Sequence, residues 1–473
     1  MRAHEAGALH AEAGHRGPSW LREPADANAL VPALWARNVE RRANGVVAVA
    51  GVPVDEIARE FGTPAYVMDE DDFRTRARSF GEAFHAAFER LCGGADVYYA
   101  GKAFLSIASA RWVAEEGLCL DVCSGGELTV ALRAGFPPER IGMHGNNKSV
   151  AELARALDAG VDRIVIDSPI EITRLAELAR ERGVRARVLV RITVGVEAHT
   201  HEYIATAHED QKFGFSLAGG AAADAVAAVL AEPSLELLGL HSHIGSQIFD
   251  TSAFEVAARR TLGLHAAIRA EHGIELPELD LGGGYGIAYT TQDDPMPPPE
   301  LAASMAEIVE HECRGYGVAV PWITVEPGRA IAGPAGFTLY EVGTVKEVEL
   351  DAGASRIYVA VDGGMSDNIR TALYDADFSC TLASRRSDAP PVLARVVGKH
   401  CESGDILVKD EFLPADVCPG DLIAVPATGA YCRSLANTYN HVPRPPVIAV
   451  ADGKARVVVR RETEDDLLRL DVG

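Results

Sequence analysis

The sequence has no long apolar run and no excess of basic residues. A membrane-spanning helix needs roughly 18 consecutive apolar residues, and no run in this chain approaches that length, so we expect no membrane segment. Lys and Arg number 45 against 68 Asp and Glu, which gives a formal charge of -23. Because nucleic acids and anionic lipids are bound through basic surfaces, this balance argues against both classes of partner.

Paired cysteines and metal-ligand motifs are also missing. The eight cysteines are scattered and form no CxxC pair: Cys92, Cys119, Cys123, Cys313, Cys380, Cys401, Cys418 and Cys432. Their spacing predicts reduced thiols in a cytoplasmic protein. Residues 1–24 contain no apolar segment after a basic start, so no secretory signal is expected. The one His-dense tract (His199, His201, His208 and Glu209) follows no metal-ligand spacing, and we predict no metal site.

What the sequence does contain is a repeated alternation of apolar runs and amphipathic stretches. The 473 residues exceed one ordinary core, and 48% of them are hydrophobic. The runs rich in Val, Ile and Leu are 97–100, 118–122, 140–143, 163–167, 188–192, 237–241, 279–281 and 322–326. This alternation predicts a (β/α)8 TIM-type barrel. An open doubly wound sheet is disfavoured, because 282–287 lacks the last Gly of the GxGxxG fingerprint.

The pattern changes after about residue 334. Short strands joined by turn residues are expected at 338–348, 357–361, 392–397, 406–409, 422–425 and 447–450. They predict an all-β sandwich or barrel, and two early strands, 46–50 and 64–68, are expected to pair with it. The predicted class is therefore α/β plus all-β. The predicted organisation is a mobile extension over 1–30, the first part of the β-domain over 31–70, the barrel over 71–333 and the rest of the β-domain over 334–473.

Polar or glycine residues follow every one of the eight predicted barrel strands. In chain order they are Lys102, Asp121 with Ser124, His144 with Asn146, Asp167, Arg191, His241 with His243, Gly282–Gly284, and Glu326 with Arg329. Barrel enzymes carry their active sites at the carboxyl ends of the strands. The sequence therefore predicts a catalytic site on this rim.

Three features of the rim bear on a cofactor. Lys102 lies in an apolar run, where a buried lysine could attack a carbonyl to form a Schiff base, or could simply extend out of the strand end. The Gly282–Gly284 turn and the Ser246 hydroxyl could bind a phosphate, although such turns are also common without ligands. Glu326 could keep a pyridine nitrogen protonated, or could pair with Arg329. Together these features indicate a phosphorylated aldehyde cofactor.

A series of motifs runs in order from about residue 45 to the end of the chain. They are YYAGKAF around Lys102, DVCSGGEL, HGNNKS, GLHSHIGSQ, DLGGGYGI, EPGRA, DGGMSDNIRTALY, GKHCESGD and GAYC. In this order they resemble the pyridoxal-phosphate decarboxylases of the alanine-racemase-like barrel class, specifically the diaminopimelate decarboxylases. The first 30 residues lie outside the resemblance.

The resemblance implies pyridoxal 5'-phosphate as the cofactor and Lys102 as the residue that bonds to it. It implies that His243 stacks on the ring face and that Glu326 faces the ring nitrogen. The other implied cofactor-binding positions are Ser246, Gly284, Gly328, Arg329 and Tyr431.

The resemblance also implies a reaction: decarboxylation of meso-diaminopimelate to L-lysine and CO2, the last step of lysine biosynthesis. Loss of CO2 leaves a carbanion that the cofactor ring delocalises. Cys401 resembles the proton donor that then reprotonates the carbon, and in this family it comes from the second subunit of a homodimer. The implied substrate-binding residues are Arg329, Arg370, Tyr374, Glu402 and Tyr431.

Two other functions remain open at this point. Diaminopimelate carries a second amino-acid head, which Arg370 and Arg329 would bind by its carboxylate and Glu402 by its ammonium. A decarboxylase or racemase for another basic amino acid, of the ornithine or arginine type, would leave a desolvated arginine without a partner. A non-catalytic regulator with the same fold is disfavoured, because Lys102 and Cys401 are both present.

Overall fold

The computed structural model of the chain describes residues 17–195, 212–349 and 355–473. The chain divides into two compact units. The barrel unit comprises Arg74–Gly286 and Pro295–Ile331, and the sheet unit comprises the described parts of Met1–Phe73, Ile287–Asp294 and Ala332–Gly473. The His-dense tract around His199 and His208 lies outside the described residues.

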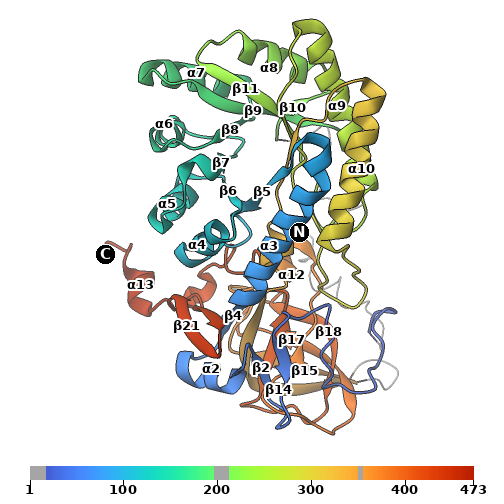
Figure 1. Ribbon diagram of the computed structural model, residues 1–473. Helices are drawn as coiled ribbons and strands as arrows, with labels where there is room; N and C mark the ends of the chain where they lie inside the picture. Colours follow the sequence, from blue (N-terminus) through green and yellow to red (C-terminus); the bar gives the residue numbers. More distant parts are fainter. Residues whose placement is uncertain (1–16, 196–211, 350–354) are drawn as a thin grey trace, which may run out of the picture. The chain divides into compact units, whose positions relative to one another are not determined.

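A closed ring of eight parallel strands forms the barrel unit, as predicted (Figure 1). The strands are β5 (Ala95–Ala100), β6 (Cys119–Val122), β7 (Ile141–Met143), β8 (Arg163–Ile166), β9 (Ala186–Thr193), β11 (Leu235–His241), β12 (Glu278–Asp280) and β13 (Trp322–Val325). Pairing of β13 with β5 closes the ring, and the two-residue strand β10 (Phe215–Ser216) adds to β9. All eight predicted strands are confirmed, because alternation of apolar runs with helices is the direct signature of this fold.

Helices separate the barrel strands and surround the ring (Figure 1). They are α3 (Glu70–Cys92), α4 (Ile107–Glu115), α5 (Gly125–Ala134), α6 (Val150–Ala159), α7 (Pro169–Arg182), α8 (Ala221–Leu230), α9 (Ser252–His272) and α10 (Pro298–Tyr316). Helix α6 illustrates why they form where they do. Ser149 and Glu152 make a reciprocal capping box at its start, and Gly160 ends it in the left-handed conformation with φ of 74°.

The sheet unit is built on one nine-stranded sheet with contributions from both ends of the chain. Its strands are β4 (Ala65–Asp69), β14 (Gly336–Glu349), β15 (Ser355–Val361), β16 (Thr381–Leu382), β17 (Pro391–Val397), β18 (Ile406–Pro414), β19 (Leu422–Pro426), β20 (Val447–Ala451) and β21 (Lys454–Val459). Strand β4 lies between β14 and β20, so the predicted pairing of 64–68 with the C-terminal strands is confirmed. Short helices α12 (Arg370–Tyr374) and α13 (Glu464–Leu468) complete the unit after β15 and β21.

The predicted pairing of 46–50 with the same sheet is wrong. Strand β2 (Val47–Val49) pairs with β1 (Val39–Arg41) and β3 (Val52–Pro53) in a separate three-stranded sheet, which precedes helix α2 (Val54–Phe61). The Val47 amide donates to the Ala383 carbonyl at 2.9 Å, next to β16, but among the described residues β2 forms no strand pairing with the large sheet. Val47 and Val49 are fully buried in a core cluster that also holds Phe337 and Ile448, so the small sheet covers the large one with its side chains.

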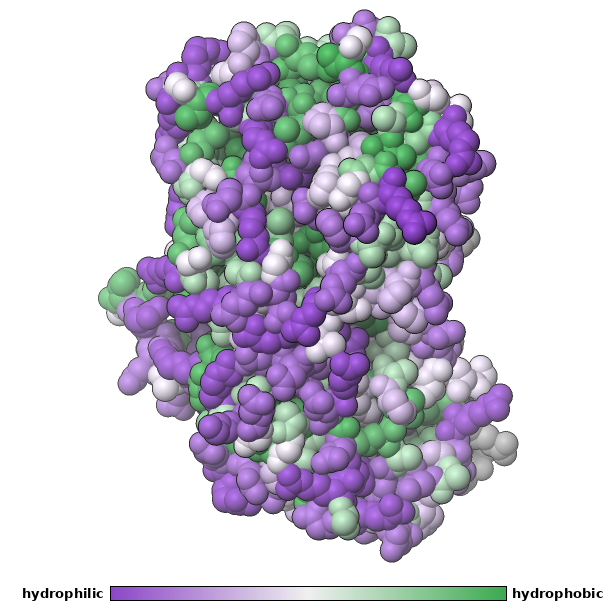
Figure 2. All heavy atoms as spheres, viewed as in Figure 1, coloured by the Kyte–Doolittle hydropathy of each residue, from purple (hydrophilic) through white to green (hydrophobic). Residues whose placement is uncertain are grey.

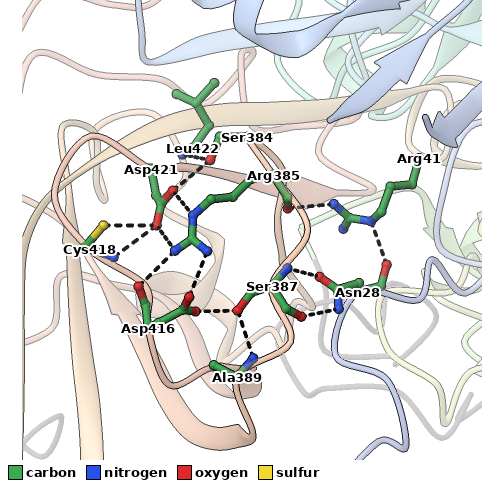
Figure 3. A network of polar contacts seen from close by, with 10 residues as sticks. All are labelled: Asn28, Arg41, Ser384, Arg385, Ser387, Ala389, Asp416, Cys418, Asp421 and Leu422. Atoms are coloured by element: carbon green, nitrogen blue, oxygen red, sulfur yellow. Dashed lines mark hydrogen bonds and ion pairs between the residues drawn. The ribbon is translucent and has the colours of Figure 1, made fainter. Parts of the chain in front are cut away.

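Residues 26–28, within the predicted N-terminal extension, dock on the loop that follows β16 (Figure 3). The Asn28 side chain donates to the Ser387 carbonyl at 2.8 Å and accepts from the Ser387 amide at 2.9 Å. In the same network Arg385 forms a two-pronged ion pair with Asp421, with both N–O distances 2.8 Å, and also contacts Asp416. These bonds hold the loop against the rest of the sheet unit.

Hydrophilic side chains cover most of the face that Figure 2 shows, with smaller apolar groups between them. Among the residues that the structure describes, no helix is both long and apolar enough to cross a bilayer.

Candidate active site

A cavity of about 320 Å³ lies among the carboxyl ends of the barrel strands. Its lining includes eight residues that were predicted on the rim: Lys102, Asp121, His144, Asn146, Arg191, His241, His243 and Glu326. Parallel strands all end on one side of a barrel, so residues far apart in the sequence meet there. Ser124, also predicted on the rim, instead caps α5 by accepting a hydrogen bond from the Glu127 amide.

The Lys102 side chain is exposed and lines this cavity, between the buried residues Gly101 and Ala103. Of the two possibilities left open by the sequence, the exposure of the side chain agrees with a lysine that extends out of the strand end. The apolar run belongs to β5, and the chain turns into the cavity directly after it. The amine is accessible to a ligand in the cavity.

Glu326 is the centre of a buried charge cluster on the other side of the same cavity. Its Oε1 lies 3.1 Å from Nε2 of His144 and 3.1 Å from Nε2 of His241. Burial opposes ionisation of Glu326, but the two imidazoles outweigh it and hold the pKa of this carboxyl well below its usual range. Arg329 donates to the Ser246 hydroxyl at 2.6 Å.

The two imidazoles differ in charge. Burial alone would lower the pKa of His144, but the negative charges of Asp121 and Glu326 outweigh burial and raise this pKa to about 10. The His144 ring is therefore an imidazolium. Burial lowers the pKa of His241 to about 4 despite Glu326, so this ring is neutral. Burial also raises the pKa of Asp121 to about 6, against the pull of His144.

A third imidazole, His243, is fixed in its neutral form by a backbone contact. The Gly283 amide donates to His243 Nδ1 at 3.2 Å, so Nδ1 carries no proton. Burial and the neighbouring Lys102 ammonium hold the pKa of His243 well below its usual value. A neutral, oriented ring is suited to stacking on another aromatic ring.

Glycines line up where the loops after β11, β12 and β13 approach each other. A Cβ on Gly284 would lie 2.3 Å from the Gly245 carbonyl oxygen, and Gly284 has φ of +109°. A Cβ on Gly328 would lie 2.9 Å from that of Ala100. Only glycine fits at these positions, and the backbone there stays open to a ligand.

These residues fit pyridoxal phosphate. Glu326 Oε1 is buried beside the Nε2 atoms of His144 and His241, which lower the pKa of this carboxyl, and it can accept a hydrogen bond from a protonated ring nitrogen. The glycine loops and the Ser246 hydroxyl offer the small side chains and the donor that a phosphate needs. Lys102 offers an amine to an aldehyde in the same cavity.

Five predicted site residues lie in the sheet unit. Three of them form one cluster, in which the Arg370 guanidinium faces the rings of Tyr374 at 5.6 Å and Tyr431 at 5.3 Å. A third ring, Tyr289, lies 5.4 Å from the same guanidinium. Arg370 is 6% exposed, and its Nε has no hydrogen-bond partner in the described part of the chain. The cluster thus holds a buried guanidinium that can bind a carboxylate.

The remaining two, Cys401 and Glu402, are exposed on the loop between β17 and β18. The loop is anchored at both ends of this pair. The Asp405 carboxylate accepts from the His400 amide at 2.7 Å and from the Met365 amide at 2.6 Å. His400 Nε2 lies 2.8 Å from the Ser366 hydroxyl. These hydrogen bonds fix the backbone of the loop, while the Cys401 thiol and the Glu402 carboxylate remain exposed.

Sequence reasoning missed Tyr289, and also Phe213, whose ring contacts Arg191 at 4.4 Å on the cavity wall. Neither lies in a periodic segment or at a strand end. No local pattern marks either residue, because both owe their position to irregular loops.

Comparison with known proteins agrees with this geometry. Residues 76–333 match the family model described as the pyridoxal-binding domain of pyridoxal-dependent decarboxylases. The chain is 60% identical to the diaminopimelate decarboxylase of Mycobacterium tuberculosis over 447 residues, 94% of this chain and 98% of that one. It is 47% identical to that of Bacillus subtilis, covering 91% and 96% of the two chains. The crystal structure of diaminopimelate decarboxylase from M. jannaschii in complex with L-lysine superposes with a TM-score of 0.85 at 31% identity, covering 93% and 99%.

Proposed function

The chain belongs to the diaminopimelate decarboxylase family, and we propose that it converts meso-diaminopimelate to L-lysine and CO2 with pyridoxal 5'-phosphate as cofactor. This is the last step of lysine biosynthesis. The observation that carries the proposal is the presence, in one cavity, of an accessible lysine amine and a buried carboxylate whose pKa two imidazoles hold well below its usual range.

Residues of the barrel unit, together with Tyr431 of the sheet unit, would hold the cofactor. Lys102 would bond to it through the side-chain amine, His243 would pack on the ring, and Glu326 would accept a hydrogen bond from the ring nitrogen. Ser246, Gly284, Gly328 and Arg329 would hold the phosphate. When bound, the cofactor supplies an electron sink for the carbanion left by CO2.

The chain's own groups then position the substrate and move one proton. Arg370 and Arg329 bind carboxylate, and Tyr374 and Tyr431 pack beside Arg370. Glu402 binds the distal ammonium of the substrate. Cys401 Sγ would donate the proton that replaces the lost carboxylate, and the Lys102 amine, which would hold the cofactor, would also carry protons at its Nζ.

We propose further that the enzyme works in the cytoplasm as a homodimer whose subunits share active sites. Support comes from Cys401 and Glu402, which are exposed on an anchored loop of the sheet unit while the cofactor cavity is lined by barrel residues. Mixing Lys102→Ala with Cys401→Ala subunits tests this directly. Shared sites restore activity that neither variant has alone, and unshared sites do not.

The experiment that tests the function compares CO2 release from meso-diaminopimelate, ornithine and arginine by the purified holoenzyme. We expect release from meso-diaminopimelate only, with L-lysine as the sole amino-acid product by chiral analysis. Ornithine lacks the distal carboxylate and would leave a buried arginine unpaired, which costs several kcal/mol. Faster release from ornithine would contradict the proposal in favour of a decarboxylase of another basic amino acid.

A further inference from the structure

Two carboxylates share one imidazole beside the cofactor cavity. His144 Nε2 lies 3.2 Å from Asp121 Oδ1 and 3.1 Å from Glu326 Oε1. Asp121 lies near the end of β6, and His144 and Glu326 directly follow β7 and β13, strands that end on the same rim. His241 reaches the same Glu326 oxygen but has no second carboxylate within ion-pair distance among the described residues. His144 is therefore the cation of the cluster.

Other charges face this group from the neighbouring strands. Asp280 adds negative charge from β12, and Arg191 and Lys102 add positive charge near β9 and β5. Burial raises the pKa of Asp280 well above its usual range. His144 is within ion-pair distance of both Glu326 and Asp121.

We infer that His144 is a positioning residue for the cofactor. It holds Glu326 ionised and fixes the direction of Oε1, so that Glu326 can accept a hydrogen bond from the protonated ring nitrogen. The inference rests on the proposed role of Glu326. It gives His144 no contact with substrate and no part in proton transfer to carbon.

The physical reason is the cost of a buried carboxylate. Glu326 is 9% exposed and would take up a proton if only neutral groups faced it. A protonated Glu326 would offer a donor where an acceptor is needed, and the ring nitrogen would lose its proton. The same Nε2 also lies 3.2 Å from Asp121 Oδ1, and this second carboxylate favours the charged ring and the ring orientation that faces Glu326.

The first measurement is the ¹⁵N chemical shift of ring-labelled pyridoxal phosphate in the reconstituted holoenzyme, which reports protonation of the ring nitrogen directly. We expect a protonated nitrogen in the wild type, an unprotonated one in Glu326→Gln, and a mixture that loses its proton as the pH rises in His144→Gln. The control is His265→Gln, which removes another buried histidine of the same unit that makes no hydrogen bond within the described residues. It should leave the shift unchanged.

The second measurement is a double-mutant cycle on cofactor affinity. We expect His144→Gln to weaken binding about 10- to 100-fold, the usual effect of removing a partner that orients a ligand. In the Glu326→Gln background the same change should have little further effect, because His144 acts through Glu326. Should His144→Gln fail to fold, Asp121→Asn tests the same link, with a smaller effect in the same direction.

The outcomes separate the two hypotheses. An unprotonated ring nitrogen in the wild type would overturn the proposed role of Glu326 itself. A protonated nitrogen in both the wild type and His144→Gln, or additive effects in the cycle, would overturn only the inference about His144.

Discussion

The close contact between the loops after β11 and β12 makes Gly284→Ala a sharp test of the cofactor site. The new Cβ would lie 2.3 Å from the Gly245 carbonyl oxygen, and the backbone φ of +109° is strained for any residue with a side chain. The loops cannot simply separate. Ile248 donates its amide to the Gly284 carbonyl at 2.9 Å, and Gly286 donates back to Ile248 at 2.9 Å.

The magnitude follows from these contacts. Backbone strain contributes roughly 1–3 kcal/mol. Moving the loops apart costs one or two backbone hydrogen bonds, each worth about 1 kcal/mol. If the cofactor binds only to the original loop conformation, the free energy needed to restore that conformation is subtracted from the free energy of binding. A cost of about 3 kcal/mol corresponds to a loss of about 100-fold in affinity.

The assay titrates apoenzyme with pyridoxal phosphate, followed by protein fluorescence, and measures the free energy of unfolding in urea alongside. The matched control is Gly220→Ala, which has a similar positive φ of +79° but nothing within 4 Å of its Cβ. We expect the control to lose about 1–2 kcal/mol of stability and no cofactor affinity. The reasoning would be refuted if folded Gly284→Ala bound the cofactor as tightly as the wild type, or if both variants weakened binding equally.

Three further predictions concern the sheet unit. Tyr289→Leu removes one of the aromatic rings around Arg370 and should raise KM for the substrate about fivefold with little change in kcat. Tyr289→Phe keeps the ring and should keep wild-type kinetics. Equal effects of the two substitutions would contradict a role for the ring. Arg385→Leu leaves the buried Asp421 without its ion pair and should lower the free energy of unfolding by roughly 2 kcal/mol in urea titrations. The exposed pair of Arg59 and Asp55 is its control, since Arg59→Leu should cost under about 0.5 kcal/mol, and similar losses in both would count against the argument. Burial raises the pKa of Asp367 from 3.8 to about 7. Between pH 3.8 and about pH 7 the native state therefore keeps a proton that the unfolded state has lost. The free energy of unfolding should fall by up to about 4 kcal/mol as the pH rises through this range. Asp367→Asn should flatten this part of the profile of unfolding free energy against pH, and an unchanged slope would show that another group titrates.

Much of the barrel site could be predicted because barrel geometry turns sequence order into spatial order. Each apolar run marks a strand, and the first polar residue after it lies on the common rim. This is why Lys102, His243 and Glu326 could be placed at one site although they are far apart in the chain. For Lys102 the sequence left burial and extension out of the strand end both open, because its neighbours Gly101 and Ala103 give the same local pattern whichever way the side chain points.

Elements of the sheet unit were harder to predict where packing replaces pairing. The residues of β2 have the composition of a strand, and sequence alone does not say which strand they pair with. Tyr289 reaches Arg370 from Ile287–Asp294, a segment that leaves the barrel sequence to join the sheet unit. A segment of this kind has no periodic sequence pattern that would predict its position, because its path depends on which of its apolar side chains are buried.

The ionisation state of Glu326 shows most clearly what lies beyond sequence reasoning. His144 and His241 follow or end β7 and β11, which are not neighbours in the ring, yet both Nε2 atoms lie 3.1 Å from one carboxylate oxygen. Asp121 lies beside His144 and helps to raise the pKa of that ring, whereas burial lowers the pKa of His241. A motif search finds each residue separately, but the charge on Glu326 depends on all four at once. Since a ring nitrogen keeps its proton only beside an ionised carboxylate, the chemistry of the site depends on this cluster as much as on Lys102.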